Sequence, residues 1–263
     1  MITFNRLGNL GRLGNQMFQY AALKGIATNH EYSFAIPPKE AFGSVDEKVL
    51  GDIESTIYDV FELGEFDKGL SSFPTYLEKE HTFDKNLFDS CPDNIDLMGY
   101  FQTEKYFQHI ENQIREDFTF KDEILEICEK FLFDPDCISL HIRRGDYINL
   151  QHFHPLVTIE YYEKALTYFS DRIPVIIFSD DPEWCKEQKL FSDDRFLISD
   201  NNQTGIDLCL MSMCNYHIIA NSSLSWWGSW LAKSKKTIAP KIWFTQQTGN
   251  DCSDKYLKNW III

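Results

Sequence analysis

The chain has 263 residues, of which 43% are hydrophobic and 15% aromatic, so it can bury enough apolar surface to exclude a disordered protein. Its net charge of −15 argues against binding to nucleic acid or anionic lipid, because those phosphates require a basic face. This length corresponds to one large domain or two compact ones. The seven cysteines are odd in number and form no CxxC pair, which argues against a disulfide framework and a cysteine-pair zinc site.

Targeting signals are absent from the sequence pattern. The N-terminal residues lack the apolar core of a signal peptide, and no apolar run reaches the roughly 18 residues of a membrane span. Free thiols suit a reducing compartment. We therefore expect a cytoplasmic protein without a transmembrane segment, at most peripheral at the inner face of the membrane.

Strand and helix patterns alternate along the chain, which is typical of a parallel, doubly wound α/β sheet. In the first half the predicted strands are 2–4 and 32–36, and the predicted helices are 16–28, 107–118 and 124–131. A loop with Gly8, Gly11 and Gly14 precedes the first helix. Residues 39–56 are predicted to be loop or weak helix, and 57–100 to be irregular.

The second half shows the alternation more clearly. The predicted strands are 137–142, 174–178, 196–199, 217–220 and 237–239. The predicted helices are 159–170, 205–214 and a Trp-rich segment after residue 223, and residues 260–263 are expected to pack as a strand or helix end. We place a domain boundary near residue 133. This gives an N-terminal domain over 1–133 and a C-terminal domain over 134–263, whose last segment is free to pack back on the N-terminal domain.

Polar clusters follow three of the predicted strands, at residues 143–146, 179–181 and 221–223. In doubly wound sheets, ligands bind at the carboxyl ends of the strands. The coincidence predicts a binding site at this edge.

Each polar cluster has a functional and a structural interpretation. The glycine loop at 8–14 resembles an anion-binding turn before a helix N-terminus, although neither the P-loop nor the dinucleotide pattern is matched. A plain tight turn is the alternative. In HIRRGDY at 141–147, His141 and Arg143 are expected on one face of the strand, with Arg144 pointing away. Arg143 could hold a diphosphate, and Arg144 could pair with Asp146 to hold the loop; the alternative is a purely structural ion-pair cluster.

The remaining polar candidates also have both a functional and a structural interpretation. Asp180 and Asp181 could bind a guanine, ribose hydroxyls or a metal, or simply cap a helix that starts at Pro182. Ser222 and Ser223 could form an anion-binding edge. The tryptophans at helical spacing favour core packing, with one left free to stack on a sugar: Trp226, Trp227 and Trp230. The histidines that follow the arginine pair are candidates for a base or for surface residues: His152 and His154.

Taken together, the segments RLGNQMFQYA (12–21), HIRRGDY (141–147) and NSSLSWWGSWL (221–231) resemble the signature motifs of the α-1,2-fucosyltransferases, glycosyltransferase family 11. FSDDP (178–182) fits as a shorter fourth motif. The bacterial members are the most similar in type. The loop before Asn15 is longer than the family's usual Gly-Gly-Leu-Gly-Asn-Gln entry.

The resemblance implies an α/β protein of GT-B type, with two Rossmann-like domains facing a cleft. GDP-β-L-fucose would bind the C-terminal domain, and the N-terminal domain would shape the acceptor site. The reaction would be an inverting transfer of L-fucose to the 2-hydroxyl of a terminal galactose on a glycan, without metal or cofactor. Surface polysaccharide or O-antigen units are suitable acceptors, and the oligomeric state is not predicted.

The resemblance also implies roles for individual residues. The catalytic candidates are Asn15, Arg143 for the β-phosphate, and Asp146 or His154 as general base. The candidates for binding GDP-fucose are Gly14, Gln16, His141, Arg144, Asp180, Asp181, Asn221, Ser222 and Ser223. Two alternatives remain open: a transferase with another GDP-sugar or linkage, and a non-catalytic nucleotide-sugar-binding protein.

Overall fold

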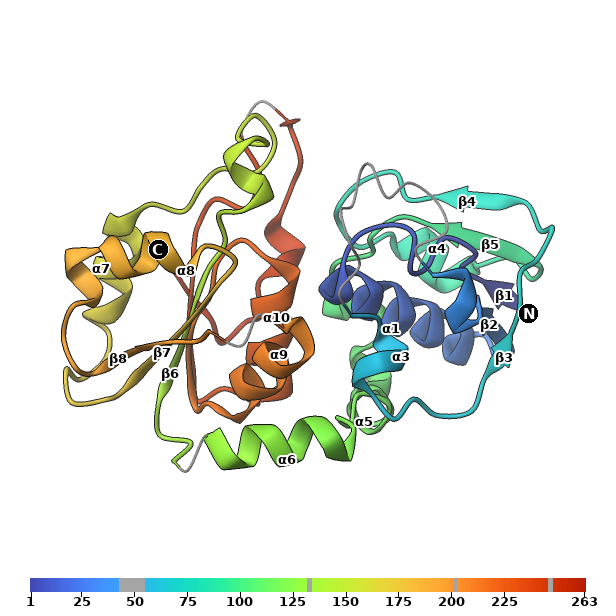
Figure 1. The fold of residues 1–263 in the computed structure, drawn as a ribbon. Coiled ribbons are helices and arrows are strands. Elements are labelled where there is room, and N and C mark those ends of the chain that lie inside the picture. The colour runs from blue at the N-terminus through green and yellow to red at the C-terminus, as the bar shows by residue number, and fades with distance from the viewer. Residues whose placement is uncertain (43–54, 132–133, 201–202, 246–247) are drawn as a thin grey trace. The chain divides into compact units, whose positions relative to one another are not determined.

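The computed structural model describes residues 1–42, 55–131, 134–200, 203–245 and 248–263. The chain divides into two compact units (Figure 1). The first comprises Met1–Lys121 and Asp251–Leu257, and the second comprises Asp122–Asn250 and Lys258–Ile263. The boundary expected near residue 133 falls beside residues outside the described part, and the division lies earlier, between Lys121 and Asp122.

The first unit contains a parallel sheet with the strand order β3-β2-β1-β5-β4. Its strands are β1 (Ile2–Thr3), β2 (Phe34–Ile36), β3 (Asp67–Lys68), β4 (Thr75–Leu77) and β5 (Ile95–Met98). Its helices are α1 (Leu13–Asn29), α3 (Ile57–Val60), α4 (Lys85–Ser90) and α5 (Glu111–Asp117), with 3₁₀ turns at Lys39–Ala41, Glu104–Tyr106, Gln108–Ile110 and Ser253–Lys255. The chain leaves β1 toward β2 and β3 and later returns to β5, so the strand order reverses between β1 and β5.

Helix α1 is the core element of this unit. It is rich in alanine and straight-chain residues, which favour a helix, and most of its side chains are buried. Gly25 allows a close approach, because a Cβ there would lie 2.0 Å from the carbonyl oxygen of Tyr106. The helix begins at Leu13 rather than at Gln16 as predicted, so Gly14 and Asn15 belong to its first turn.

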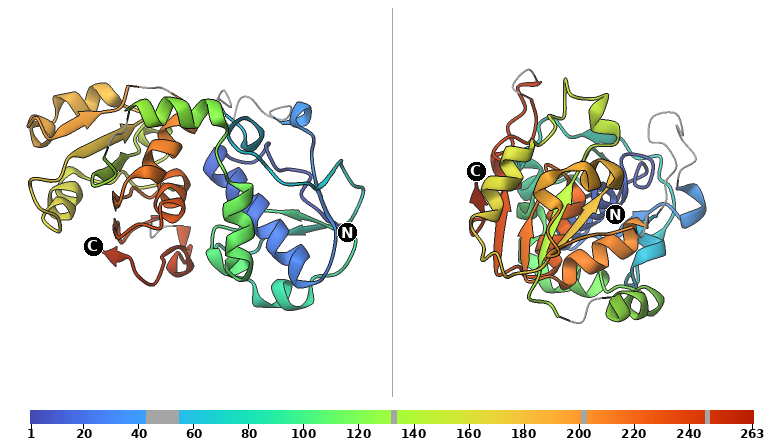
Figure 2. Two further views of the ribbon diagram at one scale, coloured as in Figure 1. Left: turned by 90° about the horizontal axis from the view of Figure 1, so that it is seen from below. Right: turned by 60° about the vertical axis from the view of Figure 1, so that its left-hand side comes forward.

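The second unit contains a parallel sheet with the strand order β11-β10-β9-β6-β7-β8. Its strands are β6 (Ile138–Ile142), β7 (Val175–Ser179), β8 (Phe196–Ile198), β9 (Tyr216–Ile218), β10 (Lys236–Ala239) and β11 (Ile261–Ile262). Its helices are α6 (Asp122–Phe131), α7 (Ile159–Leu166), α8 (Pro182–Glu187), α9 (Thr204–Met213) and α10 (Ser223–Leu231), with 3₁₀ turns at Asp146–Ile148 and Lys189–Phe191. Figure 2 shows β11 at the C-terminus, where it forms the sheet edge.

Helices cover both faces of this second sheet. In Figure 1, α7 and α8 lie on one face, and α9 and α10 lie on the other. Helix α6 packs on α9, with Cys128 fully buried. This contact places α6 in the second unit, whereas the sequence-based boundary had assigned it to the first. The strand order reverses between β6 and β9.

The predicted alternation of strands and helices is confirmed in the second unit, within a few residues at each end. In the first unit, residues 57–100 were expected to be irregular but contain α3, α4 and three strands. The segment 39–56 was predicted to be loop or weak helix. Its residues 43–54, with Gly43 and Gly51, lie outside the described residues. Within the described residues, the structure contains no helix long and apolar enough to span a bilayer.

Candidate functional site

The polar clusters predicted from the sequence converge at one edge of the second sheet. The loops that follow β6, β7 and β9 all leave its carboxyl edge, because these three strands are parallel neighbours. The edge includes the reversal of strand order between β6 and β9, where doubly wound sheets open a crevice for a ligand. Tyr147 connects the loops that follow β6 and β9, because its hydroxyl donates to the carbonyl oxygen of Asn221 at 3.0 Å.

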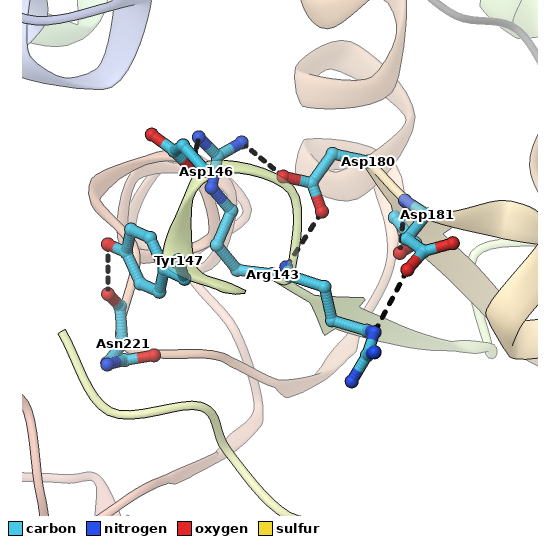
Figure 3. Close-up of polar contacts among 8 residues, drawn as sticks. Arg143, Asp146, Tyr147, Asp180, Asp181 and Asn221 are labelled. Carbon is cyan, nitrogen blue, oxygen red and sulfur yellow. Dashed lines mark hydrogen bonds and ion pairs between the residues drawn. The ribbon is translucent and has the colours of Figure 1, made fainter. Parts of the chain in front are cut away.

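Arg143 lies at the centre of this edge (Figure 3). Its Nη2 donates to Asp146 Oδ1 at 2.6 Å, and its Nη1 lies 2.8 Å from Asp180 Oδ2. The side chain is only 15% exposed. A guanidinium carries five N–H donors, so among the described residues the two ion pairs leave three of them for a ligand. The two ion pairs therefore hold Arg143 in a fixed orientation, in which its remaining N–H groups can bind a ligand.

Asp180 also holds the backbone of the loop. Its Oδ1 accepts from the backbone N–H of Arg144 at 2.8 Å. A Cβ at Gly145 would lie 2.5 Å from Asp180 Oδ2, so glycine is required for this close approach. The carboxylate from the end of β7 thus fixes the loop that follows β6.

Arg144 forms a separate ion pair. Its Nε donates to Asp181 Oδ2 at 3.0 Å, and its guanidinium lies 4.0 Å from the ring centroid of Trp184. The pairing of Arg144 with Asp146 expected from the sequence is wrong, because Asp146 pairs with Arg143 instead. The other oxygen of Asp181 caps α8 by accepting from the N–H of Trp184 at 3.2 Å. The structural interpretation of Asp181 as a helix cap is therefore confirmed, and its role toward guanine stays a prediction.

Two buried polar atoms at this edge lack a partner among the described residues. His141 is 4% exposed, and its Nδ1 has no hydrogen-bond partner there. Burial, assisted by the charge of Arg143, lowers the pKa of His141 to about 3, so the ring is neutral near pH 7. Asn221 is fully buried, and its Nδ2 donates to the carbonyl oxygens of Pro155 and Trp243.

These two carbonyls fix the orientation of the Asn221 amide, because only its nitrogen can donate to both. The oxygen Oδ1 then lacks a donor among the described residues. Buried polar atoms without partners are rare in folded proteins and are satisfied by a ligand or by water. A ligand with N–H or O–H groups fits this atom.

The N-terminus of α10 adds partial positive charge to the same edge. Ser222 is the N-cap residue, but its side chain makes no capping hydrogen bond to the helix. The amides of the first turn, beginning at Ser223, are therefore not occupied by the cap and point along the helix dipole. Such a terminus favours an anion. The tryptophans of the same helix are buried and pack on one another, which confirms the core interpretation: Trp226, Trp227 and Trp230.

The two candidates for a general base differ in their surroundings. The carboxylate of Asp146 is 38% exposed and carries the ion pair with Arg143. His154 stacks on Tyr147, with ring centroids 4.4 Å apart and planes at 5°. His154 also contacts the rings of Phe153 and Phe244. Neither arrangement identifies the base, and both assignments stay predictions.

The predicted residues of the first unit lie at the carboxyl end of β1. Asn15 is half-buried, and its Oδ1 accepts from Gln102 Nε2 at 2.6 Å. Gln16 is fully buried, and its Oε1 accepts from the N–H of Ile57 at 3.1 Å. Gly14 is buried in the first turn of α1. The role of these residues toward a substrate stays a prediction.

Sequence reasoning did not identify three residues of this loop region. Gln19 donates to the carbonyl oxygens of Leu10 and Gly99, which ties the glycine loop to the segment after β5. Gln102 bridges Asn15 and Lys255, and Lys255 comes from the far end of the chain. No local sequence pattern predicts these long-range contacts. Within the described part of the chain, no group of three or more His, Cys, Asp or Glu side chains is arranged to hold a metal ion.

Comparison with known proteins shows the family to which the chain belongs. Residues 70–263 match the sequence profile of glycosyl transferase family 11. An alpha-1,2-colitosyltransferase of Escherichia coli is 32% identical over 94% of this chain and 96% of its own length. The chain belongs to glycosyltransferase family 11. It is therefore a glycosyltransferase.

More distant relatives and solved structures agree on the fold. The galactoside alpha-(1,2)-fucosyltransferase 2 of Bos taurus is 26% identical over 85% of this chain and 67% of its own length. The crystal structure of the NodZ alpha-1,6-fucosyltransferase soaked with GDP-fucose has a TM-score of 0.57 at 15% identity, covering 92% of this chain and 94% of that one. POFUT1 in complex with GDP has a TM-score of 0.54 at 10% identity, covering 89% and 94%. The predicted α/β fold of GT-B type is confirmed.

Proposed function

We propose that this family 11 glycosyltransferase moves L-fucose from GDP-β-L-fucose to the 2-hydroxyl of a terminal galactose on a glycan, with inversion at the sugar carbon. The observation that carries the proposal is the edge between β6 and β9. There, within the described part of the chain, Arg143 keeps three N–H donors that no carboxylate takes, and it lies on the same sheet edge as the N-terminus of α10. A diphosphate needs this combination of a cation and amide dipoles.

The chemistry assigned to each group follows from the bonds that change. The acceptor oxygen forms a bond to C1 of fucose, and the bond from C1 to the β-phosphate oxygen breaks, so GDP leaves with the electron pair. Arg143 and the α10 N-terminus would stabilise the charge that develops on the leaving phosphate. The acceptor proton would pass to Asp146 or His154. His141 Nδ1 and Asn221 Oδ1 offer buried partners for the polar groups of the nucleotide.

Colitose is the second candidate sugar, because the 32% identical Escherichia coli relative is named as a colitosyltransferase. Colitose is fucose without its 3-hydroxyl. A site that hydrogen-bonds this hydroxyl discriminates strongly against the deoxy sugar, by roughly 10⁴-fold, whereas an apolar pocket barely rejects the extra hydroxyl. An O-antigen unit ending in galactose is the acceptor we propose, since another relative is named as an O-antigen biosynthesis glycosyltransferase.

The two sugars are distinguished by comparing kcat/KM for GDP-fucose and GDP-colitose with the same galactoside acceptor. The proposal predicts a higher kcat/KM with GDP-fucose. A higher kcat/KM with GDP-colitose would identify colitose, rather than fucose, as the transferred sugar. GDP-fucose that is neither transferred nor bound would refute the proposed donor.

A further inference from the structure

A chain of three side chains lies at the reversal of strand order in the first sheet. Asn15 is in the first turn of α1, which follows β1, and Gln102 lies in the segment after β5. These two strands flank the reversal, so the pair lies at the place where a doubly wound sheet binds a ligand. The third member, Lys255, is in the segment Asp251–Leu257, which belongs to this unit although it comes from the end of the chain.

The lysine determines how both amides are oriented. Its Nζ lies 2.7 Å from Gln102 Oε1, and an ammonium group donates but does not accept. The oxygen of Gln102 must therefore face Lys255, and its Nε2 must face Asn15. Since Nε2 donates to Asn15 Oδ1 at 2.6 Å, the NH₂ group of Asn15 is left on the opposite side of its amide.

The NH₂ group of Asn15 lies against the glycine loop. A Cβ added to Gly11 would come within 2.2 Å of Asn15 Nδ2, and Gly11 has a φ of +86°. Glycine is thus required there for its conformation and for the space that the amide fills. In the part of the chain that the structure describes, Nδ2 donates to no acceptor.

Lys255 is built into the protein rather than attached to its surface. It is 1% exposed, and burial lowers its pKa to about 8 despite the nearby carboxylate of Glu78, so it stays mainly protonated near pH 7. Its segment is held in place independently by Asp254. That carboxylate pairs with Lys105 and accepts from the N–H of Phe83 at 2.8 Å.

We propose that Lys255 is a positioning residue that acts through Gln102 to orient the Asn15 amide, with its NH₂ group presented to an oxygen of a sugar substrate bound at this edge of the first sheet. This inference rests on the proposed function for the identity of the ligand. It assigns the segment Asp251–Leu257 a part in substrate binding by the first unit. Residues nearly the whole length of the chain apart thereby define one hydrogen-bond donor.

Gln102→Glu is the sharpest variant, because it preserves size and the contact with Lys255. A glutamate accepts from Lys255 but cannot donate to Asn15 Oδ1, so the Asn15 amide must turn its NH₂ group inward. We expect kcat with GDP-fucose to fall at least tenfold. In Asn15→Ala, the added Gln102→Glu change should cost less than twofold more, since the group it acts on is already gone.

Lys255→Met and Lys105→Met form the matched pair. Lys255 belongs to the segment Asp251–Leu257, and Lys105 pairs with Asp254 of the same segment. Of these two lysines, only Lys255 contacts Gln102. We expect Lys255→Met to lower kcat as Gln102→Glu does, Lys255→Arg to recover part of it, and Lys105→Met to stay within twofold of wild type. The Asn15 side-chain amide, observed by ¹H–¹⁵N NMR and assigned from its loss in Asn15→Ala, gives a second readout. It should shift in Gln102→Glu and Lys255→Met and stay in place in Lys105→Met.

Each outcome decides the proposal. An Asn15 amide signal that does not move in Gln102→Glu and Lys255→Met overturns it. In an active enzyme, a shifted signal with unchanged kcat overturns it as well. A wild-type chain that neither binds nor turns over GDP-fucose refutes the proposed function instead, and the NMR signal then decides on the coupling from Lys255 to Asn15.

Discussion

Replacing Arg143 by alanine should weaken GDP binding and also destabilise the fold, with costs of similar size. The substitution removes the ion pairs to Asp146 and Asp180, at 2.6 and 2.8 Å, together with the three N–H donors that face no carboxylate. The two carboxylates remain near each other without their cation. Both effects should therefore appear, and their sizes can be separated.

The stability cost follows from exposure. The side chains of Asp146 and Asp180 are 38% and 23% exposed, so water partly replaces the lost partner. The cost should be about 2 kcal/mol, which is below the 3–5 kcal/mol typical of a fully buried pair. A hydrogen bond from a guanidinium to phosphate contributes about 1.5–3 kcal/mol, so the Kd for GDP should rise about 10- to 150-fold.

Isothermal titration with GDP measures the affinity, and thermal unfolding measures the stability. Arg144→Ala is the comparison variant, because it also removes an ion pair, to Asp181, and its stacking on Trp184. Since Arg144 and Asp181 are themselves predicted to lie near the nucleotide, we expect this variant to raise the Kd for GDP, but by less than Arg143→Ala does. Arg143→Lys, which keeps the charge but loses the planar fork, should fall between wild type and alanine. A Kd in Arg143→Ala within threefold of wild type, or a larger effect in Arg144→Ala, would refute the phosphate assignment.

Three further predictions concern the second unit and the thiols. Gly145→Ala places a methyl group 2.5 Å from Asp180 Oδ2 and should lower the unfolding free energy by about 1–3 kcal/mol; an unchanged urea midpoint would contradict this. Burial lowers the pKa of His141 to about 3 and that of His217 to about 4, so the unfolded chain binds more protons below pH 6.5. Stability should then fall as pH decreases from 6.5 toward 4, at up to about 1.4 kcal/mol per pH unit for each histidine, and equal urea midpoints at pH 7 and pH 5 would contradict it. Of the seven cysteines only Cys252 is partly exposed, so a thiol reagent should label one site quickly in the folded protein and the others on unfolding; rapid labelling of several sites would refute the burial pattern.

The second sheet could be predicted from sequence because its central strands are apolar runs that end at polar residues. β6 and β7 are short runs of buried residues that end at polar clusters, which is the pattern of a parallel sheet. The first unit lacks this pattern. β5 contains Asp96, which is buried and accepts from Thr3 Oγ1 at 2.9 Å and from the N–H of Asn5 at 2.8 Å. A carboxylate satisfied by partners about 90 residues away interrupts the apolar run, so no local rule predicts the strand.

The candidate site shows the same division. The loops after β6, β7 and β9 were predicted to meet because neighbouring parallel strands end at one edge. The pairing within that edge was predicted incorrectly, because sequence proximity suggested Arg144 with Asp146, whereas the loop turn brings Arg143 to Asp146 and Asp180. The contact of Lys255 with Gln102 spans 153 positions and has no signature in either segment.

The most direct test of the proposed activity is transfer from GDP-fucose to a galactoside such as lactose or N-acetyllactosamine, performed in EDTA, with the product linkage determined by NMR. We predict an α-1,2-linked fucosyl galactose and release of GDP in equal amount. Activity that is lost in EDTA and returns with a divalent ion would contradict the proposed metal independence. Absence of both transfer and GDP release, with GDP-fucose at saturating concentration, would contradict the proposed fucosyl transfer itself.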